Sequence, residues 1–326
     1  MKLASLKAGG RDGTLIVVDK RLQQAVKVPE IAHSLQQALE NWAMAEPKLQ
    51  HVSDSLNAGK AKDAFKLEMK DLAAVQPRAP QFVDGSAYLA HVERVRKARK
   101  AEMPPSFLHD PLMYQAVSDG FIPPLDPIRM GDEAWGIDFE SEVGVVVDEV
   151  PMGVSAADAA RHIRLVLLIN DVSLRNLIPD ELAKGFGFLQ SKPRSALSPI
   201  AVTPDELGSA WKDGKLHLSL ITHLNGQLFG EPEAGVDMQF SFPQLISHAA
   251  KTRPLAAGSI VGSGTVANQD EAKGSSCLAE KRMLEIIKGG KAETPFMKFG
   301  DRVRIEMKDK DGHSIFGAID QVVEKL

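Results

Sequence analysis

Two glutamates, Glu140 and Glu142, stand two residues apart within the stretch Gly136–Val147. The odd-numbered apolar residues of this stretch point to one face of a β-strand, so both carboxylates share the opposite face. Carboxylates held side by side repel each other, and a divalent cation removes that repulsion because Mg²⁺ and Ca²⁺ prefer carboxylate oxygens. The pair therefore predicts a metal site, with a solvated strand face that happens to carry two acids as the alternative.

A third acid, Asp171, ends the apolar strand predicted over Leu165–Asp171. A charge in that position must be paired, exposed or metal-bound, because burying an isolated charge is expensive. Arg175 follows four residues later and could pair with it, which is the structural alternative to metal binding. Lys192 lies in the glycine-bearing loop Gly185–Pro199, where the backbone can approach a ligand closely.

Further candidates flank these acids. Asp84 and His91 are seven residues apart, which on a helix is nearly two turns, so they could lie on one side of it. His91 falls in the helix predicted over Tyr88–Lys100. For His91 the alternative is an exposed position on an amphipathic helix. Gly262–Thr265 is a small-residue loop that suits an anion, and Glu280 is one more acid downstream.

The elements that must position these residues divide the chain near residue 75. Residues 1–75 are interpreted as a small accessory or cap domain, and residues 76–326 as the catalytic domain, with a proline-bearing linker over Asp71–Pro80. In the first part the sequence predicts strands and helices as follows: strands Lys2–Leu6, Thr14–Val18 and Gln24–Val28, and helices Ile31–Ala45 and Gly59–Glu68.

Strands dominate the second part. It is expected to contain the irregular loop Met103–Pro127, a helix over Phe240–Lys251, a strand over Gly258–Val266, and a final strand pair, Arg302–Met307 and Ser314–Ala318. This pattern predicts an α+β protein with a large mixed or antiparallel sheet, and it argues against a doubly wound fold.

Composition narrows the class of protein. The 326 residues are 44% hydrophobic and 25% charged with a net charge of −4, which is ordinary for a globular protein and gives no indication of nucleic-acid binding. The single cysteine, Cys277, excludes an internal disulfide and fits a reducing compartment. The start of the chain has no apolar signal-peptide region, and no run approaches the roughly 20 apolar residues of a membrane span. We therefore expect a cytoplasmic protein.

Six short motifs occur in an order that resembles the fumarylacetoacetate hydrolase (fumarylacetoacetase) family, over roughly residues 80–326. They are DFESEV (138–143), LLINDVSLRNL (167–177), LQSKPRSALSP (189–199), GSGTV (262–266), GSSCLAE (274–280) and FGDRVRIEM (299–307). The resemblance implies a large mixed sheet or β-roll catalytic domain of the fumarylacetoacetase type. It also implies a small β-rich N-terminal domain and a homodimer.

The same resemblance implies roles for individual residues. The four metal ligands would be Asp84, Glu140, Glu142 and Asp171, holding Mg²⁺ or Ca²⁺ and in some members Mn²⁺. The water-activating base and its acidic partner would be His91 and Glu280, with Lys192 as a further catalytic residue. The substrate contacts would be Arg175, Tyr114 and Thr265. The chain departs from the family at Ile178, where fumarylacetoacetases place a substrate-binding glutamine.

These residues predict a metal-dependent hydrolase. Its substrate would be a small 1,3-diketo acid of the fumarylacetoacetate or acylpyruvate type, cleaved at a C–C bond in the breakdown of tyrosine or other aromatic compounds. An isomerase, hydratase or decarboxylase of 2-oxo acids on the same fold is the alternative, and a non-enzymatic scaffold with a degenerate site is the third. No nucleic acid or membrane is expected as a partner.

Overall fold

The computed structural model describes residues 1–98, 102 and 104–326. Its first 75 residues contain the elements β1 (Lys2–Leu6), β2 (Thr14–Val18), β3 (Gln24–Lys27), β4 (Phe65–Lys66), α1 (Leu35–Glu40) and α2 (Trp42–Asn57). The three strand predictions are confirmed, while the helix predicted over Ile31–Ala45 is divided at Asn41. The helix predicted over Gly59–Glu68 is wrong: Gly59 turns the chain with a φ of +68°, and Phe65 then pairs with β3.

One long sheet runs through both parts of the chain, in the order β4-β3-β2-β1-β13-β10-β9-β18-β5-β6, with β12 paired to β10. Its remaining strands are β5 (Phe82–Gly85), β6 (Met113–Ala116), β9 (Ser141–Val147), β10 (Ile163–Asn170), β12 (Ala196–Leu197), β13 (Ile200–Val202) and β18 (Ile260–Gly262). The pairing of β1 with β13 joins the N-terminal strands to the rest. The division near residue 75 stays a prediction.

A second sheet has the order β17-β16-β19-β20-β7. Its strands are β7 (Ile128–Met130), β16 (Leu220–Leu224), β17 (Gln227–Gly230), β19 (Arg302–Lys308) and β20 (Ser314–Lys325). Two small pairs complete the strands, β8 (Ile137–Asp138) with β11 (Ser173–Leu174), and β14 (Trp211–Lys212) with β15 (Lys215–Leu216). The other helices are α3 (Leu89–Ala98), α4 (Ala156–Ala159), α5 (Ile178–Ala183), α6 (Phe242–Ala249) and α7 (Leu278–Gly289).

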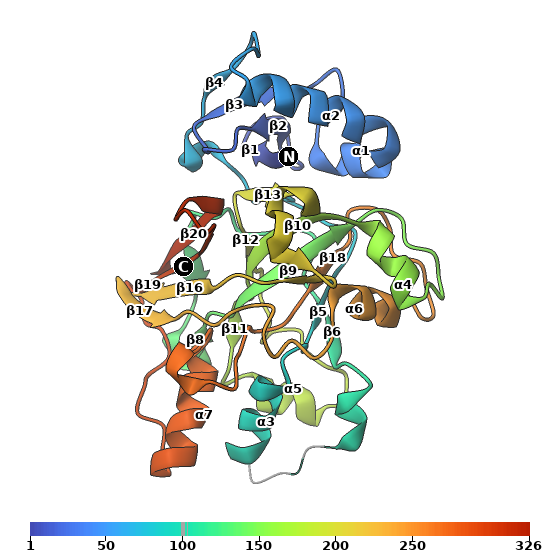
Figure 1. Cartoon of the computed structure of the whole chain (residues 1–326). Helices are drawn as coiled ribbons and strands as arrows, with labels where there is room; N and C mark the ends of the chain where they lie inside the picture. The colour runs from blue at the N-terminus through green and yellow to red at the C-terminus, as the bar shows by residue number, and fades with distance from the viewer. Residues whose placement is uncertain (99–101, 103) are drawn as a thin grey trace.

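The α+β class with a large mixed sheet is confirmed. Side chains along the strands of this sheet point alternately into two hydrophobic cores. Val143, Val145 and Val147 lie in one core with residues of the second sheet, whereas Val146 lies in the other core with residues of α1 and α2. In Figure 1, α1 and α2 lie at one end of the molecule and α3, α5 and α7 at the other. No helix among the described residues combines the length and the apolar character that a membrane crossing needs.

The strand predicted over Gly136–Val147 is interrupted. Its first part, β8, pairs with β11, and its second part, β9, pairs with β10, so the chain changes partner at Phe139 and Glu140. The prediction that Asp84 and His91 share a helix is also wrong. Asp84 lies on β5, which pairs in parallel with β18, and the helix that carries His91 begins at Leu89.

Two further differences concern loops. The segment predicted as irregular over Met103–Pro127 contains β6, and its first residue, Met103, lies outside the described residues. The last two residues of the helix predicted over Tyr88–Lys100 also lie outside them.

The helix α7 was not predicted. It begins after Cys277 and carries Glu280 in its first turn.

Candidate active site

Eight of the ten predicted site residues line one cavity of about 160 Å³. They are Asp84, His91, Tyr114, Glu140, Glu142, Arg175, Lys192 and Thr265. The other two lie directly behind its wall, since Asp171 accepts hydrogen bonds from Tyr114 and Lys192, and Glu280 contacts His91. Residues from seven separate stretches of the chain therefore meet at one place, where β5 and β9 lie beside α3 and α5.

Three of the predicted ligands form a compact acidic cluster. Asp84, Glu142 and Asp171 each offer a carboxylate oxygen within 4.8 Å of the others, and all three side chains are buried. The sheet register brings them together, because β18 pairs with both β5 and β9. A Cβ atom at Gly262 of β18 would lie 2.2 Å from Asp84 Oδ1, so glycine is needed there to leave room for the carboxylate.

Among the described residues, the only cation that contacts the acidic cluster is Lys192, which donates to Asp171. Both oxygens of Glu142 are buried and have no hydrogen-bond partner among the described residues. Burial, and then the charge of Asp171, raises the pKa of Asp84 to about 8, while burial and the charge of Asp84 raise the pKa of Glu142 well above its usual range. Unpartnered buried carboxylate oxygens are the donor set that Mg²⁺, Mn²⁺ or Ca²⁺ takes, so the residues present fit a hard divalent cation.

Glu140 differs from Glu142 because both of its oxygens accept hydrogen bonds. Oε1 accepts hydrogen bonds from Arg175 Nη2 at 2.6 Å and Thr265 Oγ1 at 2.9 Å. Oε2 accepts from Lys192 Nζ at 2.6 Å and Ser173 Oγ at 3.1 Å. Burial opposes ionisation of Glu140, but the charges of Arg175 and Lys192 outweigh it and hold the pKa of this carboxyl well below its usual range. Its role as a fourth metal ligand stays a prediction.

Lys192 bridges the two groups of acids. Its Nζ donates to Glu140 and, also at 2.6 Å, to Asp171 Oδ2. Burial lowers the pKa of Lys192, but Asp171 and Glu140 outweigh it, so the net pKa rises and the ammonium stays charged. Arg175 pairs with Asp138 and Glu140, and not with Asp171 as the alternative interpretation of the sequence had it.

His91 and Glu280 form a hydrogen-bonded pair at the edge of the cavity. Nδ1 of His91 lies 2.9 Å from Oε2 of Glu280, which is completely buried. Arg94, one turn after His91 on α3, donates to the other oxygen of Glu280 at 3.0 Å and to the carbonyl of Asn268 at 2.6 Å. The histidine ring is thus oriented on one side, and its Nε2 is left for the cavity.

Sequence reasoning missed several residues that build this site. Arg94 follows His91 by three residues, a spacing at which helix side chains are neighbours, and that was the available signal. Phe188 lines the cavity and packs edge-on against Tyr114, with ring centroids 5.0 Å apart. Glu181 holds backbone groups eight to ten residues further along, and Asp138 holds backbone groups about 140 residues away.

Glu181 holds the loop that leads to Lys192. Its carboxylate accepts hydrogen bonds from the backbone N–H groups of Leu189, Gln190 and Ser191 and from the Ser191 hydroxyl. Burial works against ionisation, but the hydroxyl and the three N–H groups outweigh it and lower the pKa of Glu181 to about 2. The contribution of this group to stability is therefore complete above its ordinary pKa of 4.5 and is lost as pH falls towards 2.

Replacing Glu181 by glutamine should lower kcat/KM by about 10- to 100-fold, the cost of removing a group that orients a site residue. The amide would face N–H donors, and the loop before Lys192 would lose its anchor. The variant should also lose less stability than the wild type between pH 4.5 and 2, as measured by urea unfolding at several pH values.

A matched control is available at Glu285, which similarly accepts N–H groups of Glu293 and Thr294 and the Thr294 hydroxyl. Glu285→Gln should change acid stability and leave kcat/KM unchanged. Equal activity of the Glu181 and Glu285 variants would contradict the anchoring role of Glu181.

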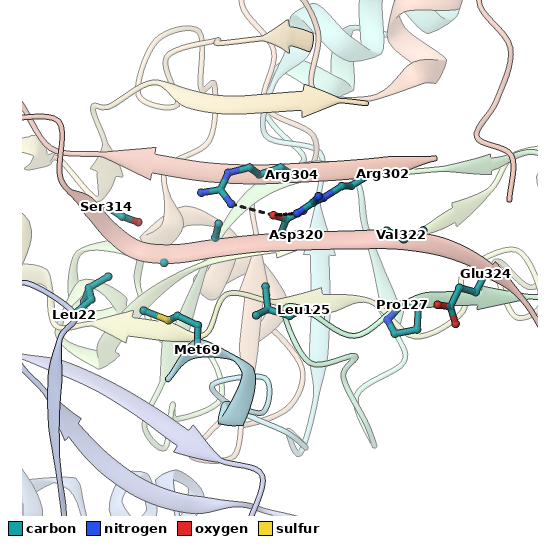
Figure 2. A pocket seen from close by; sticks show the side chains of 12 residues that line it. Leu22, Met69, Leu125, Pro127, Arg302, Arg304, Ser314, Asp320, Val322 and Glu324 are labelled. Carbon is teal, nitrogen blue, oxygen red and sulfur yellow. Dashed lines mark hydrogen bonds and ion pairs between the residues drawn. The ribbon is translucent and has the colours of Figure 1, made fainter. Parts of the chain in front are cut away.

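A larger pocket, of about 610 Å³, lies elsewhere (Figure 2). Leu22, Met69 and Leu125 line its apolar side. Arg302 and Arg304 reach it from β19, and both donate to Asp320 of β20, at 2.6 and 3.0 Å. The charges at this pocket are thus already paired. The smaller cavity is lined by Glu142, whose buried oxygens have no hydrogen-bond partner among the described residues, and this identifies the smaller cavity as the candidate site.

Comparison with known proteins identifies the family of this chain. Residues 81–324 match the family described as fumarylacetoacetate (FAA) hydrolase C-terminal, and residues 1–78 match fumarylacetoacetase N-terminal domain 2. The human protein "Oxaloacetate tautomerase FAHD1, mitochondrial" is 27% identical over 183 residues, which cover 56% of this chain and 76% of that protein. The 2,4-didehydro-3-deoxy-L-rhamnonate hydrolase of Sphingomonas sp. (strain SKA58) is 28% identical over 167 residues, covering 50% and 55%.

The fold as a whole is shared with a solved structure. The maleylpyruvate hydrolase of Sphingobium sp. SYK-6, in complex with manganese(II) and pyruvate, superimposes with a TM-score of 0.66. The match covers 100% of this chain and 99% of that one at 14% sequence identity. At this identity the match shows a shared fold and nothing more. With both of its parts matched by models of one family, the chain belongs to the fumarylacetoacetate hydrolase family of enzymes.

Proposed function

We propose that this enzyme is a divalent-metal-dependent hydrolase that cleaves a C–C bond of a 1,3-diketo acid of the acylpyruvate or fumarylacetoacetate type, in the breakdown of aromatic compounds such as tyrosine. The observation that carries the proposal is the His91–Glu280 pair beside the acidic cluster. Hydrolysis needs a group that takes a proton from water, and the buried carboxylate of Glu280 holds His91 as such a base.

The residues divide the work as follows. Nε2 of His91 accepts a proton from water as the oxygen adds to a carbonyl carbon, and the buried carboxylate of Glu280 stabilises the imidazolium that results. The C–C bond to the central carbon then breaks, and its electron pair becomes the enolate of the leaving fragment. The ammonium of Lys192 lies at the cavity to neutralise oxyanion charge, and the enolate carbon finally takes up a proton.

Asp84, Glu142 and Asp171 are the residues that would hold the cation, with Glu140 beside them. A divalent cation there would supply Lewis-acid stabilisation of developing negative charge. Mg²⁺ or Ca²⁺ is the proposed ion, and Mn²⁺ has the support of the manganese complex of the maleylpyruvate hydrolase.

The proposal is tested with acetylpyruvate and Mn²⁺. Hydrolysis predicts that loss of the diketo absorbance is matched by an equal amount of pyruvate and of acetate. Loss of an enol signal without pyruvate release would instead support the second candidate, a tautomerase or isomerase of 2-oxo acids, which the likeness to the oxaloacetate tautomerase favours.

Ile178 gives a prediction about substrate choice. It begins α5 and lines the cavity together with Phe188. Because isoleucine offers no hydrogen bond, we expect Ile178→Gln to shift the ratio of kcat/KM for acetylpyruvate to that for fumarylpyruvate by about 10-fold towards the more polar substrate, as 1–3 kcal/mol of pocket selectivity implies.

The control for this variant is Leu182→Gln, because Leu182 lies on the same helix and is exposed. That substitution should leave the ratio unchanged. An unchanged ratio in Ile178→Gln as well would show that Ile178 has no part in selectivity.

The homodimer and the cytoplasmic location stay predictions, and sedimentation of the purified protein tests the first.

A further inference from the structure

Asp138 is a completely buried acid that does not line the cavity. Its Oδ1 accepts the backbone N–H of Leu278 at 2.8 Å. Its Oδ2 accepts the backbone N–H of Ala279 at 2.9 Å and Nε of Arg175 at 2.8 Å. Both oxygens of this one side chain therefore hold groups of the site from two distant parts of the chain.

The first part is the N-terminus of α7. The first N–H groups of a helix have no partner within the helix, and an acid that accepts them also interacts favourably with the helix dipole. Asp138 takes two of these groups, and the residue that follows them is Glu280, which holds His91. Asp138 therefore fixes the position of the base, His91, through the first turn of α7 and Glu280.

The second part is Arg175. While Nε of its guanidinium donates to Asp138, Nη2 donates to Glu140 at 2.6 Å. A guanidinium held at both ends has one orientation, because its donors form a rigid planar fork. Through Arg175, Asp138 therefore also determines where Glu140 lies beside Lys192.

We propose that Asp138 is a positioning residue that sets the distance between the His91–Glu280 pair and the Arg175–Glu140 pair. This inference rests on the proposed hydrolysis, in which water activated at the first pair must reach a carbonyl carbon held near the second. Misplacing reacting groups by about 1 Å costs on the order of 100-fold in rate.

The test is Asp138→Asn in the full-length, Mn²⁺-loaded enzyme. The amide nitrogen would face N–H donors, so one of the two connections is lost at nearly constant volume. We expect hydrolytic kcat to fall about 100-fold with KM changed less than about 3-fold, since substrate binding is retained while alignment is not. Hydrogen–deuterium exchange should become faster in peptides that cover the first turn of α7.

Asp270→Asn is the matched control, because Asp270 caps the short helix Glu271–Lys273 through the Ala272 N–H. It should change neither kcat nor exchange in α7. If Asp138→Asn does not fold, Leu278→Pro replaces it, since proline is tolerated at the first helical position and removes the N–H that Oδ1 accepts. Leu278→Ala controls for the loss of the buried leucine side chain. The Leu278→Pro variant should also lower kcat.

Normal kcat in a variant whose α7 exchanges faster would overturn the proposal, and so would a loss of kcat with unchanged exchange. These outcomes are separate from failure of the proposed function, which would appear as absence of pyruvate release by the wild-type enzyme.

Discussion

Replacement of His91 by alanine is expected to lower kcat for C–C hydrolysis by roughly 10²- to 10⁴-fold, the contribution of a positioned general base. The reason is that Glu280 engages Nδ1 and leaves Nε2 as the acceptor for a proton of water. Enolisation also needs a base, so an unchanged enolisation rate in this variant would show that a group other than His91 moves the carbon-bound proton. Pyruvate release from acetylpyruvate and enol-to-keto conversion of oxaloacetate measure the two reactions on the same protein.

His162→Ala is a matched control, because His162 also places Nδ1 at 2.7 Å from a carboxylate oxygen, that of Asp148, but does not line the cavity. It should retain both reactions. Glu280→Gln should show the same loss of hydrolysis as His91→Ala. Wild-type hydrolysis in the His91 variant would remove this residue from water activation and leave enolate chemistry as the remaining function.

Replacement of Glu142 by glutamine is expected to abolish metal-dependent activity and yet stabilise the metal-free protein. The cation loses one of the three clustered carboxylates, and Lewis-acid stabilisation of several kcal/mol corresponds to a loss of at least about 10²-fold in kcat/KM. Without metal, the substitution removes a buried acid that faces Asp84, so unfolding free energy in EDTA should rise by about 1 kcal/mol, the scale of one pKa unit.

Thermal unfolding with and without Mn²⁺ measures both effects. Saturating the wild type at 100 times Kd should stabilise it by about 2.7 kcal/mol, and the Glu142 variant should show little of this shift. Glu306→Gln is the control, because Glu306 is equally buried but is paired with Arg304 and Lys308. It should lose stability and keep the Mn²⁺ response. A normal Mn²⁺ shift in the Glu142 variant would contradict the assignment of the acidic cluster.

The sequence could predict those structural features of this protein that depend on neighbouring residues, but not those that depend on contacts between distant residues. The strands at Lys2–Leu6 and Thr14–Val18 match their predicted limits, because side-chain alternation along a strand is written in consecutive residues. The helix predicted over Gly59–Glu68 failed, because pairing of Phe65 with β3 outweighed a weak local preference. The break at Phe139 and Glu140 could not be foreseen either, since a change of strand partner leaves the alternation of side chains intact.

The sequence by itself determined which residues could do chemistry: the paired glutamates, the acid that ends an apolar strand, and the order of motifs that implies the family. Tertiary structure alone decided how they divide. Only the pairing of β18 with β5 and β9, and of β10 with β9, makes Asp84, Glu142 and Asp171 one acidic cluster. Only the packing of α3 near α7 brings His91 to Glu280 across 189 residues. Pairings of this kind depend on the sum of contacts over the whole chain, and no short stretch of residues contains that sum.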